Sequence, residues 1–309
     1  MKVLTVITSI SFLFSVIRVT TPLLFASMSY LIADFAGISN IGIEGMMLTC
    51  ALIGVIISAV TGTNVLIGFI VSIIVGIFLG LLLCFIVIRL DTDPTITGIA
   101  FNLSAAGGTI FLLYLVVGEK GISSSLNSGA LPQLTIPIIN NIPIIGQIVS
   151  GHNILTYVAF ITIPILSVFL YKTALGTHIR SCGESPEALE SVGISVEKIR
   201  YLALGISGLF AALGGVYMSM GYVSYFVKDM IAGRGFIAIA AAALGNNNPK
   251  ITMLACLLFG VADAFASHPE TQNLGIPTEL VSTIPYIVTI IALVIYSYKK
   301  REKRPMFDK

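Results

Sequence analysis

Charged side chains are scarce in this sequence. Asp, Glu, Lys and Arg make up only 10% of its 309 residues, whereas a soluble domain averages roughly 25%. Hydrophobic residues account for 56%, and the mean hydropathy is +0.99. Because a transmembrane helix needs about 20 apolar residues, spans use up most of the chain and leave no room for a large soluble catalytic domain. The net charge of +2 indicates no nucleic-acid partner.

Residues that carry redox, metal or catalytic chemistry are equally few. The four cysteines form no CxxC pair, and we interpret them as small packing residues rather than a disulfide framework. The three histidines lie far apart and match no metal or catalytic spacing. No Walker phosphate loop is present, so the chain has no visible means of hydrolysing ATP. We therefore expect no catalytic residue, no metal site and no cofactor.

Apolar runs bounded by Gly, Pro, Asn or charge predict an all-α polytopic membrane protein, with a single transmembrane domain over 1–309. Lys2 and the apolar run behind it mimic a signal peptide but lack an A-x-A cleavage site, so we interpret them as a retained first span. Two spans, 20–34 and 232–246, are short and could be tilted, broken or re-entrant. The ten expected spans are 3–17, 20–34, 42–60, 64–88, 95–117, 153–171, 199–221, 232–246, 249–267 and 279–298.

Lysine and arginine in the loops predict the orientation, because cytoplasmic loops are enriched in both. The loop 172–198 and the tail 299–309 are basic, whereas 118–152 holds only Lys120. The first two segments are therefore expected in the cytoplasm with both termini, and 118–152 outside. Arg18 is a mild exception near the outer end of the first hairpin. Five spans on each side of the outer loop would make two inverted halves, a recurring transporter plan with the pathway at the repeat interface.

Charges flanked by glycine open the third span of each half: Glu44 precedes Gly45, and Arg234 lies between two glycines. A charge at the bilayer centre costs roughly 2.5–3.5 kcal/mol, so both are candidates for the translocation pathway, or else they are solvated at span ends. Asp263 is expected to be a simple outer-end charge. Thr97, Asn102 and Ser104 on the fifth span could line a pore or hold helices together by hydrogen bonds.

The loop 172–198 contains residues typical of the start and end of a short helix. Ser185 suits an N-cap, Pro186 the first helical position and Gly193 the C-terminal stop. These residues predict a two-turn cytoplasmic helix over 186–192. An amphipathic helix of this kind can dock in a partner's groove, although it could equally be an ordinary solvated loop helix.

This loop resembles the ATPase-coupling loop of bacterial ABC importer permeases, in which Glu-Ala is followed after a short gap by Gly; here these are Glu187, Ala188 and Gly193. Three more segments resemble the branch of that family that serves ribose-type sugars, branched-chain amino acids and nucleosides. They are 40–47 (NIGIEGMM), 200–208 (RYLALGISG) and 233–240 (GRGFIAIA). The first is most similar to nucleoside-type permeases. The resemblance covers residues 20 to 298, but Asp34-Phe-Ala-Gly37 lacks the basic residue that usually precedes the first segment.

The resemblance implies a subunit of an ATP-driven importer in the bacterial cell membrane, carrying nucleosides or a related small polar solute. It implies membrane lipid around the chain and three protein partners: a cytoplasmic ABC ATPase, a second permease subunit in a heterodimer, and an extracytoplasmic substrate-binding lipoprotein. The coupling residues would be Arg180, Gly183, Glu184, Pro186, Glu187, Ala188 and Gly193. Taken together with the charge and polarity arguments above, the residues predicted for the translocation pathway are Asn40, Glu44, Thr97, Asn102, Arg234 and Phe236.

Two alternatives stay open. One is a permease of the same kind for ribose-type sugars or branched-chain amino acids. The other is a secondary transporter driven by an ion gradient, with Glu44 or Asp263 as the titrating carboxylate.

Overall fold

The computed structural model describes residues 9–137 and 145–267, and a few positions between 283 and 294. Seven of its helices are long and apolar enough to cross a membrane. These are α2 (Ile10–Phe35), α3 (Ile43–Val60), α4 (Val65–Arg89), α5 (Pro94–Val117), α8 (Ile154–Lys172), α11 (Val196–Val216, continued by the π-helix η1, Tyr217–Val223) and α13 (Pro249–Ser267). Four shorter helices are α7 (Ile145–Val149), α9 (Ala174–Glu184), α10 (Pro186–Ser191) and α12 (Arg234–Leu244).

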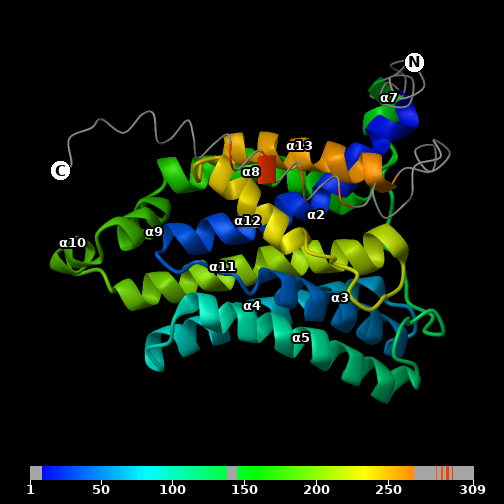
Figure 1. Ribbon diagram of the computed structural model, residues 1–309, viewed down its shortest axis with the longest axis horizontal. Coiled ribbons are helices and arrows are strands. Elements are labelled where there is room, and N and C mark those ends of the chain that lie inside the picture. Colours follow the sequence, from blue (N-terminus) through cyan, green and yellow to red (C-terminus); the bar gives the residue numbers. More distant parts are fainter. Residues whose placement is uncertain are drawn as a thin grey trace.

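The long helices lie roughly side by side along the longest axis of the molecule (Figure 1). Helix α11 runs through the middle, with α4 and α5 on one side and α8 and α13 on the other. α9 and α10 project from one end, and α7 lies at the opposite end together with the start of α2. An apolar 18-residue stretch of the α11–η1 helix is 83% buried, whereas the corresponding stretch of α5 is only 17% buried. The core therefore follows α11, and α5 is a peripheral helix with a largely open surface.

Small residues allow the close contact between α4 and α11. Gly76 and Gly80 of α4 face Gly208 of α11, and a Cβ on Gly76 would lie 3.3 Å from Cys50 Sγ and closer still to the Gly208 carbonyl. Glycines four residues apart let two backbones approach within van der Waals contact in a membrane. This spacing explains why α4, the most apolar helix, packs so closely on the core.

The first helix corrects one prediction. The two spans expected over 3–17 and 20–34 are wrong as separate spans, because α2 is continuous from Ile10 to Phe35. Polar Thr20, beside the expected break, is satisfied inside the helix, since its Oγ1 donates to Val16 O at 2.7 Å. Pro22 lacks the N–H that would bond to Arg18 O, and Tyr217 Oη donates to that carbonyl at 2.9 Å instead. A distant side chain thus repairs the break that proline would make.

The other expected spans that fall on described residues agree with observed helices to within a few residues, and 232–246 is the short helix α12. Residues 3–8 of the first expected span lie outside the described residues. The tail 299–309 and all but a few positions of the span expected at 279–298 also lie outside them. Four long helices precede the outer loop in the described part of the chain.

Candidate coupling surface and translocation pathway

The helix predicted over 186–192 is observed as α10, Pro186–Ser191. It ends in a Schellman motif: Gly193 N–H donates to Glu190 O at 2.9 Å, and Ile194 N–H donates to Leu189 O at 3.2 Å. Gly193 has φ +81°, a conformation that favours glycine. Ser185 occupies the N-cap position, but its side chain makes no capping bond.

Most of α10 is open to solvent. Leu189 is its only buried residue, and it anchors the helix to the hydrophobic core. Glu187, Ala188 and Glu190 are exposed, and Val192 just beyond the helix is 70% exposed. The outer surface of α10 therefore combines two carboxylates with apolar groups at one extremity of the molecule (Figure 1).

Helix α9 connects α10 to the end of α2. A Cβ on Gly183 would lie 2.9 Å from Gly37 N and closer still to the Phe35 carbonyl, so the two backbones are in direct contact. Cys182 Sγ donates to Ala36 O at 3.6 Å, and Arg200 Nε donates to the same carbonyl at 3.4 Å. Any displacement of α9 must therefore act on the segment that follows α2.

The remaining residues of the predicted coupling set divide into internal and exposed groups. Arg180 holds α9 to α8, since its Nε donates to Leu170 O at 3.0 Å and its guanidinium lies 4.8 Å from the Tyr171 ring centroid. Glu184 is exposed and Pro186 is half-buried.

Asp34 takes part in this end of the molecule in a way that sequence reasoning missed. One carboxylate oxygen accepts from Ser39 Oγ at 2.9 Å, and the other accepts from Asn247 Nδ2 at 2.5 Å. Asn247 lies in the turn between α12 and α13. Asp34 therefore joins the end of α2 to that turn with an amide as its partner, in a segment that lacks the basic residue of the resembling permeases.

The two glycine-flanked charges meet in the structure, although 190 residues separate them. Glu44 lies in the first turn of α3, and its two carboxylate oxygens accept from Gly233 N–H and Gly235 N–H, each at 2.7 Å. Those amides begin α12, where free N–H groups and the helix dipole favour an anion. Gly235 permits the approach, because a Cβ there would lie 2.9 Å from Glu44 N. Glu44 thus clamps the start of one helix to the start of another.

Arg234 pairs with a different carboxylate. Its Nη2 lies 3.0 Å from Asp263 Oδ2 on α13, and the two side chains are 15% and 16% exposed. Asp263 is therefore a partly buried ion-pair partner rather than the simple outer-end charge expected from the sequence. Phe236, two residues beyond Arg234, is 49% exposed.

The predicted amide and hydroxyl residues are engaged between or within helices. Buried Asn40 donates through Nδ2 to Ser207 Oγ at 3.0 Å. Asn102 accepts from Gly45 N–H at 2.8 Å and donates to Ile41 O at 3.0 Å, so it fastens α5 to the start of α3. Thr97 donates to Asp93 O at 2.9 Å within α5.

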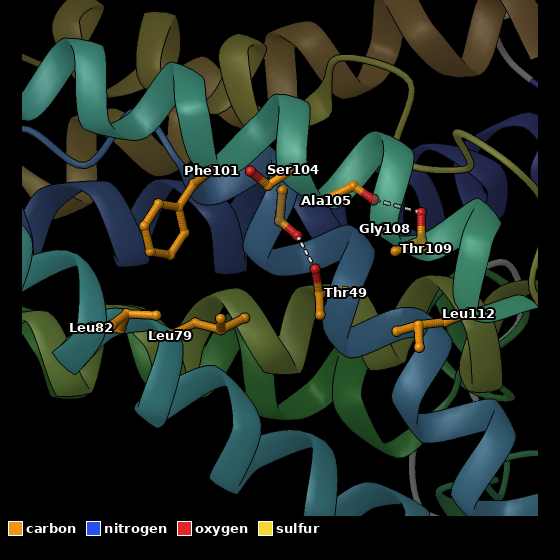
Figure 2. A pocket seen from close by; sticks show the side chains of 10 residues that line it. Thr49, Leu79, Leu82, Phe101, Ser104, Ala105, Gly108, Thr109 and Leu112 are labelled. Carbon is orange, nitrogen blue, oxygen red and sulfur yellow. Dashed lines mark hydrogen bonds between the residues drawn. The ribbon is translucent and has the colours of Figure 1, made fainter.

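A cavity of about 300 Å³ lies beside this junction, between α3, α4 and α5. Figure 2 shows Phe101 and Ser104 of α5 and Thr49 of α3 at its wall, with Leu79 and Leu82 of α4 and Leu112 of α5. Thr49 Oγ1 donates to Gly45 O at 2.8 Å, and Thr109 Oγ1 donates to Ala105 O at 2.7 Å. The wall is mostly apolar, with hydroxyls at isolated points.

Comparison with known proteins identifies the family of the chain. The family described as the permease component of branched-chain amino acid transport systems matches residues 12–293. The chain belongs to this permease family. Its multi-pass helical architecture and apolar spans agree with a protein of the cell membrane.

Several relatives of this permease are ABC transporter subunits. A putative glucose permease of Haloferax volcanii is 32% identical over 299 residues, covering 90% of this chain and 88% of the relative. A guanosine permease of Bacillus subtilis is 31% identical, covering 88% and 87%. A nucleoside permease of Lactococcus lactis is 31% identical, covering 90% and 89%. Each organism also has a second such permease at 27–28% identity. No solved structure matches the chain.

Sequence reasoning found the glycine-flanked charges and α10 of this permease, but it missed the cavity. Ser104 was considered together with Asn102 as a possible pore-lining residue, whereas Phe101, next to Asn102, was not. The signal that would have found the cavity is the small-residue run Ser104 to Gly108 on a helix otherwise rich in large apolar residues.

Proposed function

We propose that this permease is the membrane-spanning subunit of an ATP-driven importer whose solutes are nucleosides. The observation that carries the proposal is the exposed coupling-type helix α10, in a chain belonging to a family of transport permeases. The nucleoside assignment is supported by the Asn40–Met47 segment and by the guanosine and nucleoside permeases among the relatives. A sugar is the second candidate, because one relative is a putative glucose permease.

In this proposal α10 docks in a groove of a cytoplasmic ABC ATPase, which hydrolyses the ATP that this chain does not. The exposed groups of Glu187, Ala188 and Val192 supply the contact surface, and buried Leu189 transmits force to the core. The residues Arg180 and Gly183 then brace α9 against α8 and α2. With α10 in the cytoplasm, α2 begins at the outer end of the membrane (Figure 1), opposite to the inner start that the sequence predicted for the first span.

Two further partners complete the proposed importer. A second, related permease forms the other half of the pathway, and the presence of two permeases of the same description in each of three organisms supports a heterodimer. A substrate-binding lipoprotein delivers solute to the outer end, where α7 and the loops beside it lie. The proposed inverted relation between the two halves is supported by one contact. The starts of α3 and α12, the corresponding helices of the two halves, meet at Glu44.

The contacts of Glu44 and Asp263 favour the ATP-driven importer over the ion-coupled alternative. Glu44 accepts two backbone N–H groups, and Asp263 pairs with Arg234. A coupling carboxylate must exchange its partners for the ion in each cycle, so these fixed contacts favour structural roles.

The coupling role is tested in proteoliposomes that contain the complete transporter. E187A and G193A should each separate ATP hydrolysis from guanosine uptake while leaving the fold intact. G193A acts on the backbone alone, because no atom lies within 4 Å of the added Cβ and the left-handed conformation costs an L-residue roughly 1–2 kcal/mol. E119A, in the exposed loop after α5, is the matched control. Normal uptake per ATP in both α10 variants would refute the coupling role.

A further inference from the structure

The cavity beside Glu44 differs from the lipid-type surface next to it. The outer face of α4 presents large side chains such as Ile70, Ile74 and Phe78, which are 47–60% exposed. The described cavity wall instead presents hydroxyls and glycines, among them Thr49, Ser104 and Gly108, around the ring of Phe101. Lipid tails need no hydroxyls, so this wall suits a solute that is largely apolar and has a few polar edges.

The chemistry of the wall separates the three solute classes of the family. Among the described residues, no Asp, Glu, Lys, Arg or His lines the cavity, so a zwitterionic amino acid would lose hydration of both charges without compensation from them. A sugar is covered with hydroxyls, and most of them would lie unpaired against Leu79, Leu82 and Leu112. A nucleobase has two apolar faces and confines its polar atoms to its edge, which matches one ring and isolated hydroxyls.

We propose that this cavity is a binding station for the base of a nucleoside, with Phe101 as the stacking platform and Ser104 and Thr49 as partners for the base edge. The inference rests on the proposed function and specifies where it recognises its solute. The cavity volume of about 300 Å³ lies at the small end of the range for ligand pockets, as a single nucleoside requires. The half-buried Phe101 ring borders the cavity in Figure 2.

The hydroxyls are available for a ligand. No hydrogen bond of the Ser104 hydroxyl to any described residue is found, and its side chain is exposed at the cavity. Thr49 donates its proton to Gly45 O, which leaves its oxygen lone pairs to accept from a base N–H. A ligand N–H can thus donate to Thr49, while Ser104 can donate or accept.

The station is joined directly to the Glu44 clamp. Gly45 follows Glu44 and also lines the cavity. A Cβ there would lie 2.8 Å from Phe101 O and 2.9 Å from Asn102 Cα, so the start of α3 and the Phe101 turn of α5 are in backbone contact. Movement of α3 relative to α5 would therefore alter the shape of the station.

The test measures initial uptake of radiolabelled guanosine, cytidine and glucose by the complete reconstituted transporter. F101L keeps apolar bulk and removes the aromatic face, whereas F101Y keeps the face. Because stacking of a base on an aromatic side chain is lost with the ring, F101L should raise the KM for guanosine roughly 5- to 100-fold. The rise should be smaller for cytidine, whose single ring stacks over less area. F101Y should stay within about 2-fold of wild type.

F111L is the matched control, because Phe111 lies on the same helix, is 61% exposed and does not line the cavity. S104L fills the cavity from an exposed position and should abolish guanosine uptake, while A106L, at an exposed position of α5 outside the cavity lining, should not. This pair tests the station even if F101L lowers the yield of folded protein.

The outcomes separate the two proposals. A wild-type transporter without ATP-driven guanosine uptake would overturn the proposed function. If the wild type takes up guanosine, and F101L and S104L change that uptake no more than F111L and A106L do, the station alone is overturned. Glucose uptake with the same sensitivity to F101L would overturn the assignment to a base. A KM rise confined to nucleosides supports the station.

Discussion

Replacing the Glu44 carboxylate with an amide should weaken the junction between α3 and α12. The native side chain accepts two N–H bonds at 2.7 Å each, and hydrogen bonds to a charged group contribute about 1.5–3 kcal/mol. In E44Q, the amide oxygen can accept from one of Gly233 and Gly235, but the NH₂ group must face the other N–H. One charge-assisted bond is lost and one donor is left unpaired.

The expected loss for E44Q is about 2–3 kcal/mol of unfolding free energy, since the unpaired half-buried donor adds to the lost bond. E44A leaves both N–H groups without a partner and should cost more, about 3–5 kcal/mol. Thermal and denaturant unfolding in lipid nanodiscs measures both. Guanosine uptake should fall in the same order, because the start of α12 loses its link to α3.

E197Q is the control for the loss of a carboxylate charge. Glu197 pairs with Arg89 at 2.6 Å, but the side chains are 40% and 59% exposed. Exposed ion pairs typically contribute 0.2–1 kcal/mol, so E197Q should be nearly neutral. If E44Q were no more destabilising than E197Q, the two N–H bonds would not hold the helix starts together, and the clamp would be refuted.

Three other predictions follow from the contacts. G183A should cost about 1–3 kcal/mol by overpacking against the end of α2 and should lower ATP-coupled uptake, whereas G107A, with open space around its Cβ, should do neither. D263N should cost about 3 kcal/mol by leaving Arg234 without its carboxylate, and R234Q/D263N should recover part of that loss in unfolding assays. Burial lowers the pKa of His152, so the unfolded chain binds this proton first as the pH falls below about 6.5. Stability should therefore decline toward acid, and H152Q should flatten that part of the pH profile; an unchanged profile would contradict the burial argument.

The helix pattern was largely readable from the sequence because each span is bounded by local signals. Asn64 and Asp93, for example, cap the starts of α4 and α5 with their own side chains. The break expected near residue 18 was wrong for a non-local reason. Whether Pro22 ends a helix depends on the Arg18 carbonyl finding another donor, and that donor is Tyr217, 199 residues away.

The site shows the same division between local and distant information. Glycine beside Glu44 and Arg234 indicated helix starts, but nothing local says that Glu44 would bond to the amides around Arg234 rather than to Arg234 itself. Of the two roles considered for Asn102, pore lining and helix joining, its bonds to Gly45 and Ile41 agree with helix joining. The role of its neighbour Phe101 was missed, because an aromatic residue in an apolar span is usually lipid-facing or core.

These contacts form one continuous physical path through the permease. α10 connects to α9, and Gly183 of α9 rests on the backbone at Phe35 and Gly37. The short segment after α2 then leads to α3 at Ile43, where Glu44 holds the start of α12. Since closely packed backbones shift together rather than compress, a displacement of α9 has to be taken up by this segment. Its only glycine with positive φ is Gly37, at +81°, and that residue is already wedged against Gly183. The segment is therefore better suited to pass movement on toward Glu44 than to absorb it.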